Sequence, residues 1–423
     1  MNTFGKAIRR RIPAIGLGLI SALGVAAGGA VMSAPAAYAQ KASKEFGQPF
    51  MEARTMIQAK NFSGALPKIE QAAPHAKSQA EKLGIEQLRT AVYAGTNNRQ
   101  KLISSLEAQL ALGVDASTAQ KHKRTILGLY GELGNDAKAL QLTKDYLNQY
   151  GGDSALYAYV ASNAFKAKNY ADAISYSQKA IDQARKEGRR PDEKWLNIEA
   201  RSYFDQGKMD QYFASVERAA AIYPKPEYLK ILIQAAERAP KFSRAASQLD
   251  VYRATKAAGI NMSKAEQLQM GEAAFSASLP VEAEAYLKPL AESGFLGGAE
   301  DRNAARNKKM WADIQAQARA ERAGGIEGSL ADAQKAPTGV VFANVGEAFL
   351  GLEQWDKAID ALQKGIAKGG MKPDELANAQ LHLGIAQFRA GQRDAARKTW
   401  ASIQADNGAQ QLASVWTIIS QRG

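Results

Sequence analysis

Residues 342–370, FANVGEAFLGLEQWDKAIDALQKGIAKGG, contain the pattern from which the fold of the chain can be predicted. Large and small residues are placed regularly in this helix-forming stretch. The large ones are Phe342, Val345, Phe349, Trp355 and Leu362, and the small ones are Gly346, Ala358 and Gly365. Small side chains let two helix backbones approach closely, and large side chains on adjoining faces fill the remaining gap. The stretch therefore predicts two closely crossing helices whose aromatic residues belong to the core.

The same setting recurs elsewhere in the chain. Ala139, in GELGNDAKALQLTKDYL, and Ala173, in KAKNYADAISYSQKAI, each lie early in a second helix, and 173 − 139 = 34. Ala65 and Ala396 lie in similar surroundings. One helix pair cannot bury both of its apolar faces. A repeat of this length therefore predicts that successive pairs stack into a continuous core.

The phased positions resemble those of the tetratricopeptide repeat (TPR) family, whose unit is a helix–turn–helix of about 34 residues. Gly346, Ala358 and Gly365 fall on small positions of the family pattern, and Gly384 and Ala396 match two of these positions again. Weaker units extend the resemblance over most of the chain. The resemblance implies an all-α fold, a TPR-type solenoid in which antiparallel helix pairs form a right-handed superhelix.

Glycine-rich stretches indicate where the array is divided. The glycine-rich stretch at 294–298 and the glycine pair at 324–325 interrupt the regular pattern. We therefore expect a TPR-like array, then a degenerate helical connector pair, then a C-terminal TPR pair with a capping helix. Their expected ranges are 40–297, 298–337 and 338–423.

The first residues differ from the rest of the chain. Lys6 and the arginines at 9–11 precede an apolar run over 15–32, and Ala37, Tyr38 and Ala39 follow. This order of basic, apolar and small residues is that of a bacterial secretory signal peptide. We expect residues 1–39 to be removed after Ala39, which would leave a periplasmic protein. The alternative is an uncleaved N-terminal anchor.

The resemblance also implies where a ligand would bind. In the TPR family the first helices line a concave groove that usually binds an extended or helical peptide. The positions of this sequence that match the groove are Arg124, Ser162, Phe165, Lys194, Asn197, Arg201 and Phe204. We expect the partner to be a protein or peptide segment of the cell envelope, and the protein to act as a scaffold in envelope assembly, transport or secretion.

No pattern in the sequence indicates catalysis. The three histidines, His75, His122 and His382, form no H-x-x-x-H or H-E-x-x-H pair, and the chain contains no cysteine. Phosphate-loop, nucleophile-elbow and dinucleotide-binding motifs are also missing. We therefore expect no enzyme activity, no cofactor and no metal. Basic clusters lie at expected helix ends, so we do not expect nucleic-acid binding.

Net charge supports a second hypothesis. Residues 1–39 carry four Lys+Arg and no Asp+Glu, so the mature chain has a net charge of +13 − 4 = +9. A basic exported protein could recognise an anionic envelope polymer in polysaccharide export or cell-wall machinery. Such binding should weaken as ionic strength rises, whereas an apolar contact with a peptide should persist.

Overall fold

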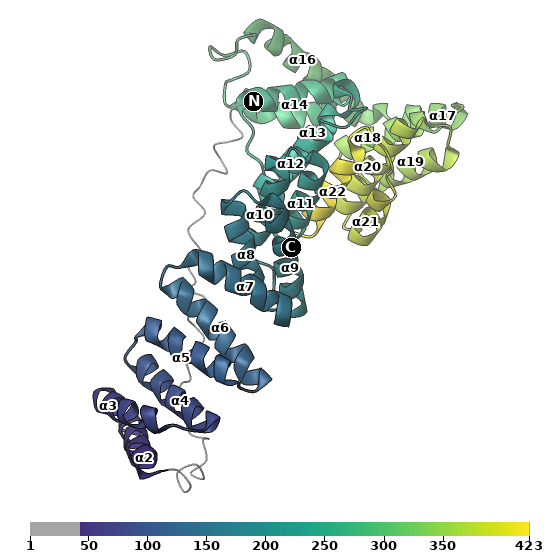
Figure 1. The fold of residues 1–423 in the computed structure, drawn as a ribbon. Helices are drawn as coiled ribbons and strands as arrows, with labels where there is room; N and C mark the ends of the chain where they lie inside the picture. Colours follow the sequence, from purple (N-terminus) through teal and green to yellow (C-terminus); the bar gives the residue numbers. More distant parts are fainter. Residues whose placement is uncertain (1–42, 423) are drawn as a thin grey trace. The chain divides into compact units, whose positions relative to one another are not determined.

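The computed structural model describes residues 43–422, so the predicted signal peptide and its cleavage site lie outside the described residues. Within that range the chain forms twenty-one α-helices and no strand (Figure 1). The predicted all-α fold of helix pairs is confirmed. In the same range, no helix combines the length and the apolar character needed to cross a membrane.

The chain forms two compact units that divide between Gln206 and Gly207. In the first unit, a short 3₁₀ turn, η4 (Ala73–His75), separates the first helix pair from the next. The α-helices of this unit are α2 (Lys44–Gln58), α3 (Phe62–Ala72), α4 (Gln79–Gly95), α5 (Arg99–Leu112), α6 (Ala116–Glu132), α7 (Asp136–Tyr150), α8 (Ser154–Lys166), α9 (Tyr170–Lys186) and α10 (Glu193–Asp205).

The second unit continues the pattern, with a π-helical segment, η5 (Glu321–Gly325), in the expected connector region. Its α-helices are α11 (Met209–Ile222), α12 (Pro226–Ala236), α13 (Arg244–Ala257), α14 (Lys264–Ser276), α15 (Pro280–Glu292), α16 (Ala304–Ala320), α17 (Glu327–Lys335), α18 (Val340–Gly351), α19 (Trp355–Lys368), α20 (Pro373–Arg389), α21 (Arg393–Ala401) and α22 (Ala409–Ser420).

The turns inside helix pairs follow a common design. In the turns before α3, α5, α7 and α9, a residue with a left-handed backbone ends the connection, and the asparagine that follows caps the second helix. Lys168 has a φ of 59°, and the side chain of Asn169 then accepts a hydrogen bond from the backbone N–H of Asp172. Asn97 and Asn98 repeat this arrangement at the start of α5. Such a cap satisfies a backbone donor that the first helical turn cannot pair.

Small residues lie where the sequence pattern places them, at the crossings inside helix pairs. Ala65, Ala139, Ala173, Ala358 and Ala396 are all completely buried. The crossings are too close for larger residues at the matching glycines, as the α18–α19 pair shows. A Cβ atom on Gly346 would lie 2.5 Å from Cγ of Leu362, which is closer than real Cβ contacts.

The last helix, α22, connects the beginning and the end of the second unit. Helix α22 packs against α20 and α21, and also against α12 and α13 (Figure 1). The Arg422 guanidinium that follows it donates hydrogen bonds to the backbone carbonyls of Ala258 and Pro224. Helix α22 thus returns to helices that precede residue 297, the expected end of the first array.

Candidate functional site

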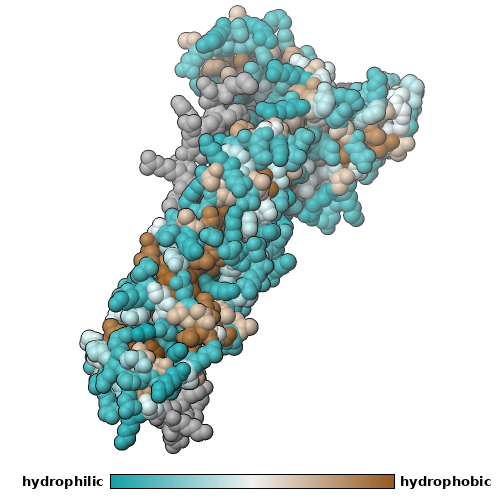
Figure 2. Space-filling view, viewed as in Figure 1, coloured by the Kyte–Doolittle hydropathy of each residue, from teal (hydrophilic) through white to brown (hydrophobic). Residues whose placement is uncertain are grey.

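The seven candidate groove residues lie on three helices of the first unit, α6, α8 and α10. Arg124 is on α6, Ser162 and Phe165 are on α8, and Lys194, Asn197, Arg201 and Phe204 are on α10. Helices α8 and α10 contact each other directly. The face drawn in Figure 2 is mostly hydrophilic, with hydrophobic residues visible in patches over helices of this unit.

Two α10 residues present a charged group beside an exposed ring. The Arg201 guanidinium lies over the Phe204 ring, 5.1 Å from its centroid, and its Nε donates to Oδ1 of Asp205 at 2.7 Å. Phe204 is 37% exposed, and about a third of the Arg201 side chain is exposed. The ring and the carboxylate restrict the rotamers of Arg201, so less entropy is lost when the guanidinium binds a ligand.

Helix α8 contributes an apolar surface but not a free hydroxyl. Phe165 is half-buried and packs against the cluster formed by Ala164, Ala173 and Ile198. Ser162 is buried, and its Oγ has no hydrogen-bond partner among the described residues. A ligand on the surface of α8 would therefore meet the edge of Phe165, whereas the Ser162 hydroxyl is covered by protein.

Arg124 is already bound within the protein. Its Nη2 donates to Oδ2 of Asp153, the residue that caps α8, and its guanidinium lies 5.9 Å from the centroid of the Tyr146 ring. Lys194 and Asn197 are exposed on α10. The structure therefore brings together Arg201 and Phe204 on α10, with Phe165 on the neighbouring helix α8, and uses Arg124 to join α6 to the start of α8.

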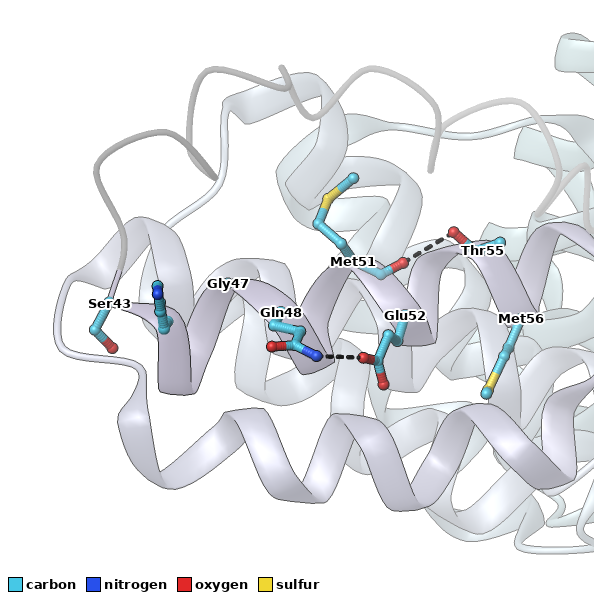
Figure 3. Close-up of a pocket in the computed structure, with 8 residues that line it drawn as sticks. Ser43, Gly47, Gln48, Met51, Glu52, Thr55 and Met56 are labelled. Atoms are coloured by element: carbon cyan, nitrogen blue, oxygen red, sulfur yellow. Dashed lines mark hydrogen bonds between the residues drawn. The ribbon is translucent and has the colours of Figure 1, made fainter.

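A surface pocket of about 570 Å³ lies along α2, at the beginning of the described chain (Figure 3). It is lined by residues between 43 and 56, with Met51 and Thr55 on one side of the helix and Gln48 beside Glu52. Gln48 donates to Glu52 at 3.0 Å, so these polar groups satisfy each other. The pocket contains none of the candidate groove residues.

A cluster of buried ionisable side chains lies in the second unit and was not predicted. It consists of Asp250 and Arg253 on α13, Glu282 on α15, Glu347 on α18 and His382 on α20. We call these five residues the Arg253 cluster. Sequence reasoning recognised His382 only as one of three scattered histidines. The cluster gives no local signal, because His382 is 129 residues from Arg253.

Arg253 is the centre of the cluster. Its Nε and Nη2 donate to the two carboxylate oxygens of Glu282, and its Nη1 donates to Oδ1 of Asp250 and Oε1 of Glu347, both at 2.8 Å. His382 Nε2 donates to Asp250 at 2.9 Å and lies 3.7 Å from Glu347. Asp250, Glu347 and His382 thus surround the guanidinium, which supplies the positive charge between them.

Mutual attraction decides the charge states in the cluster. Burial alone would raise the pKa of Asp250, but His382 and Arg253 lower it to about 2. Burial would lower the pKa of His382, but the Asp250 and Glu347 carboxylates raise it above its ordinary value. The pKa of Glu282 is lowered because Arg253 outweighs the effect of burial. These shifts all favour the ionised forms.

Comparison with known proteins agrees with the helix-pair geometry. Residues 378–407, which contain Gly384, Ala396 and Trp400, match the tetratricopeptide repeat family. This part of the chain is a tetratricopeptide repeat. Tetratricopeptide repeats act generally as protein-binding scaffolds and are typically non-catalytic, and the described part of this chain has the helix pairs on which such binding depends.

Two further comparisons with known proteins add little. The crystal structure of the P58(IPK) TPR domain is similar to this chain, with 12% identity over 89% of this chain and 99% of that chain, and a TM-score of 0.21. No curated protein sequence matches this chain.

Proposed function

We propose that this TPR protein is a periplasmic scaffold that binds a protein segment of the cell envelope on the α8 and α10 surface of its first unit. The observation that carries this proposal is the arrangement of Arg201 over the exposed Phe204 ring on α10, a helix that contacts α8. An aromatic surface beside a fixed guanidinium can hold an apolar side chain and a carboxylate or backbone carbonyl at once.

The stacked helix pairs supply rigidity for such binding. Ala173 and Ile198, which lie beneath Phe165, are buried, so the ring is held against a packed core. A preformed surface loses little conformational entropy when a peptide docks, and this improves affinity without additional contacts. The envelope partner would support assembly, transport or secretion.

Affinity capture with matched charge reversals tests the binding surface. We would compare proteins captured from envelope extracts by the mature wild type, by Arg201→Glu and by Arg185→Glu. Arg201 and Arg185 each form an ion pair within their own helix, but Arg185 lies on a second helix, α9. The partner should be lost with Arg201→Glu and retained with Arg185→Glu. Equal capture by all three proteins would contradict the proposed surface.

Two additional measurements separate the alternatives. A peptide held by Phe204 should remain bound in 0.5 to 1 M salt, roughly, and should be released by Phe204→Ala, because apolar contacts are not screened. An anionic polymer would instead dissociate as salt rises, whatever residue stands at 204. For localisation, N-terminal sequencing of the protein from the periplasm should begin at Gln40, and a chain that begins at Met1 would favour the uncleaved anchor.

A further inference from the structure

The Arg253 cluster joins parts of the second unit that are far apart in sequence. Arg253 and Asp250 come from α13 and Glu282 from α15, whereas Glu347 and His382 come from α18 and α20. All five side chains except Glu347 are more than nine-tenths buried, and Glu347 is 22% exposed. The cluster therefore lies inside the junction between the α13–α15 region and the last repeats, and its ion pairs are shielded from solvent.

The number of charges in this junction is unbalanced. Three carboxylates, from Asp250, Glu282 and Glu347, face the single guanidinium of Arg253. If His382 is neutral, the cluster has a net charge of −2, whereas protonation of His382 reduces it to −1. An uncompensated buried charge costs several kcal/mol. Nε2 of His382 can donate to Asp250 in either form, and protonation places a positive charge beside this carboxylate.

We infer that the junction of α18 and α20 with α13 and α15 is a proton-dependent latch, which closes when His382 takes up a proton and loosens when His382 loses it. This device is independent of what the first unit binds. It gives the last repeats a way to change how firmly they are held without unfolding the helix pairs themselves.

His382 is the group in this junction whose ordinary pKa lies near neutral pH. The charged or titratable groups around it are Asp250 and Arg253 on α13, Glu282 and Tyr286 on α15, and Glu347 on α18. The pKa values of Asp250 and Glu282 are lowered, and those of Arg253 and Tyr286 are raised, so these four groups keep one charge state from about pH 5 to 9. Helix α22, which also packs against α20, has no ionisable side chain.

The direction of the pH effect follows from the raised pKa of His382. The stabilisation is fully present below the ordinary histidine pKa of 6.5 and is lost as the pH rises through the folded-state pKa. Between these two values, the equilibrium constant for opening the junction should rise about tenfold per pH unit, because closure takes up one proton, and it should then level off.

Hydrogen exchange measured as a function of pH tests the latch. After correction for intrinsic exchange rates, amides of α13, α15, α18 and α20 should lose protection together as the pH rises above about 6.5. His382→Gln keeps a neutral donor at this position and should abolish the pH response. His122→Gln is the matched control in the first unit, and it should respond as wild type does. An identical response in His382→Gln and wild type would overturn the inference.

A direct titration keeps the test valid if His382→Gln does not fold. The chain has three histidines, so NMR signals of His75 and His122 can be assigned with His75→Gln and His122→Gln, which leave the Arg253 cluster intact. The remaining signal should titrate above 6.5. A pKa of His382 at or below 6.5 in the folded protein would show that closure does not take up a proton, and the latch would be refuted.

Discussion

Gly384 on α20 lies directly beneath the indole of Trp400 on α21, so that a Cβ atom on Gly384 would overlap the indole ring. Trp400 is 2% exposed, and its Nε1 donates to the backbone carbonyl of Leu381 at 3.2 Å. The hydrogen bond and the contact together fix the distance between the two helices. The small and large positions that indicated the fold in the sequence correspond to contacts of this kind.

Substitution of Gly384 should therefore be costly although alanine favours helices. We expect Gly384→Ala to lower the free energy of unfolding of the second unit by about 1–3 kcal/mol, because either the indole or one of the helices must shift. Gly328→Ala on α17 is the control. A Cβ atom there meets no atom within 4 Å, so this change should leave stability equal or raise it by up to about 1 kcal/mol. Urea denaturation followed by circular dichroism would distinguish them, and equal effects would contradict the close contact.

The sequence allows such contacts inside a pair to be predicted, because Gly384 and Trp400 are 16 residues apart in one helix–turn–helix. It did not reveal that Arg253 meets His382, since that contact depends on how α22 returns to α12 and α13. The site was predicted only in part for the same reason. The repeat pattern places Ser162 on a first helix, but neighbouring side chains decide that its hydroxyl is buried.

The left-handed turn residues give a prediction about local strain. Lys168 has a φ of 59°, a conformation that costs a residue with a Cβ about 1–2 kcal/mol and glycine almost nothing. Lys168→Gly should therefore raise the stability of the first unit by up to about 1 kcal/mol. Lys166→Gly, two residues earlier in helical backbone, should lower stability by about 0.5–1 kcal/mol. Thermal unfolding of both variants provides the comparison, and a loss of stability in Lys168→Gly would contradict the prediction.

Substitution by phenylalanine should cost different amounts of stability at the two stacked tryptophans of the second unit. Trp400 and Trp416 lie 6.2 Å apart between ring centroids, and both are almost fully buried. Trp416 Nε1 has no hydrogen-bond partner in the described chain, whereas Trp400 Nε1 donates to Leu381. Trp400→Phe should therefore lower the free energy of unfolding by about 1 kcal/mol more than Trp416→Phe does, because only Trp400→Phe removes a hydrogen bond. Chemical denaturation measures this difference, and a larger loss for Trp416→Phe would contradict it.

The acidic side of the stability profile depends on Asp250. Its pKa is lowered from 3.8 to about 2, and the pKa of Glu282 is lowered from 4.5, so both groups stabilise the folded state above their unfolded pKa values. That stabilisation is lost as the pH falls from about 4.5 towards 2. Deprotonation of His382 removes stabilisation at higher pH. The second unit should therefore be most stable between about pH 4.5 and 6.5.

Removal of the Asp250 charge should expose the dependence on the Arg253 cluster. Asp250→Asn leaves His382 and Arg253 without their shared carboxylate, which should lower the free energy of unfolding at pH 6 by about 3–5 kcal/mol. The slope between pH 4.5 and 2 should also become shallower than in wild type, because one fewer proton is taken up on unfolding of the variant at these pH values. Asp360→Asn removes an exposed partner of Lys364 and should change neither quantity measurably. Urea denaturation midpoints recorded at several pH values would measure both quantities. If Asp250→Asn kept the wild-type slope of stability against pH between 4.5 and 2, contact with His382 and Arg253 would not be what keeps Asp250 ionised.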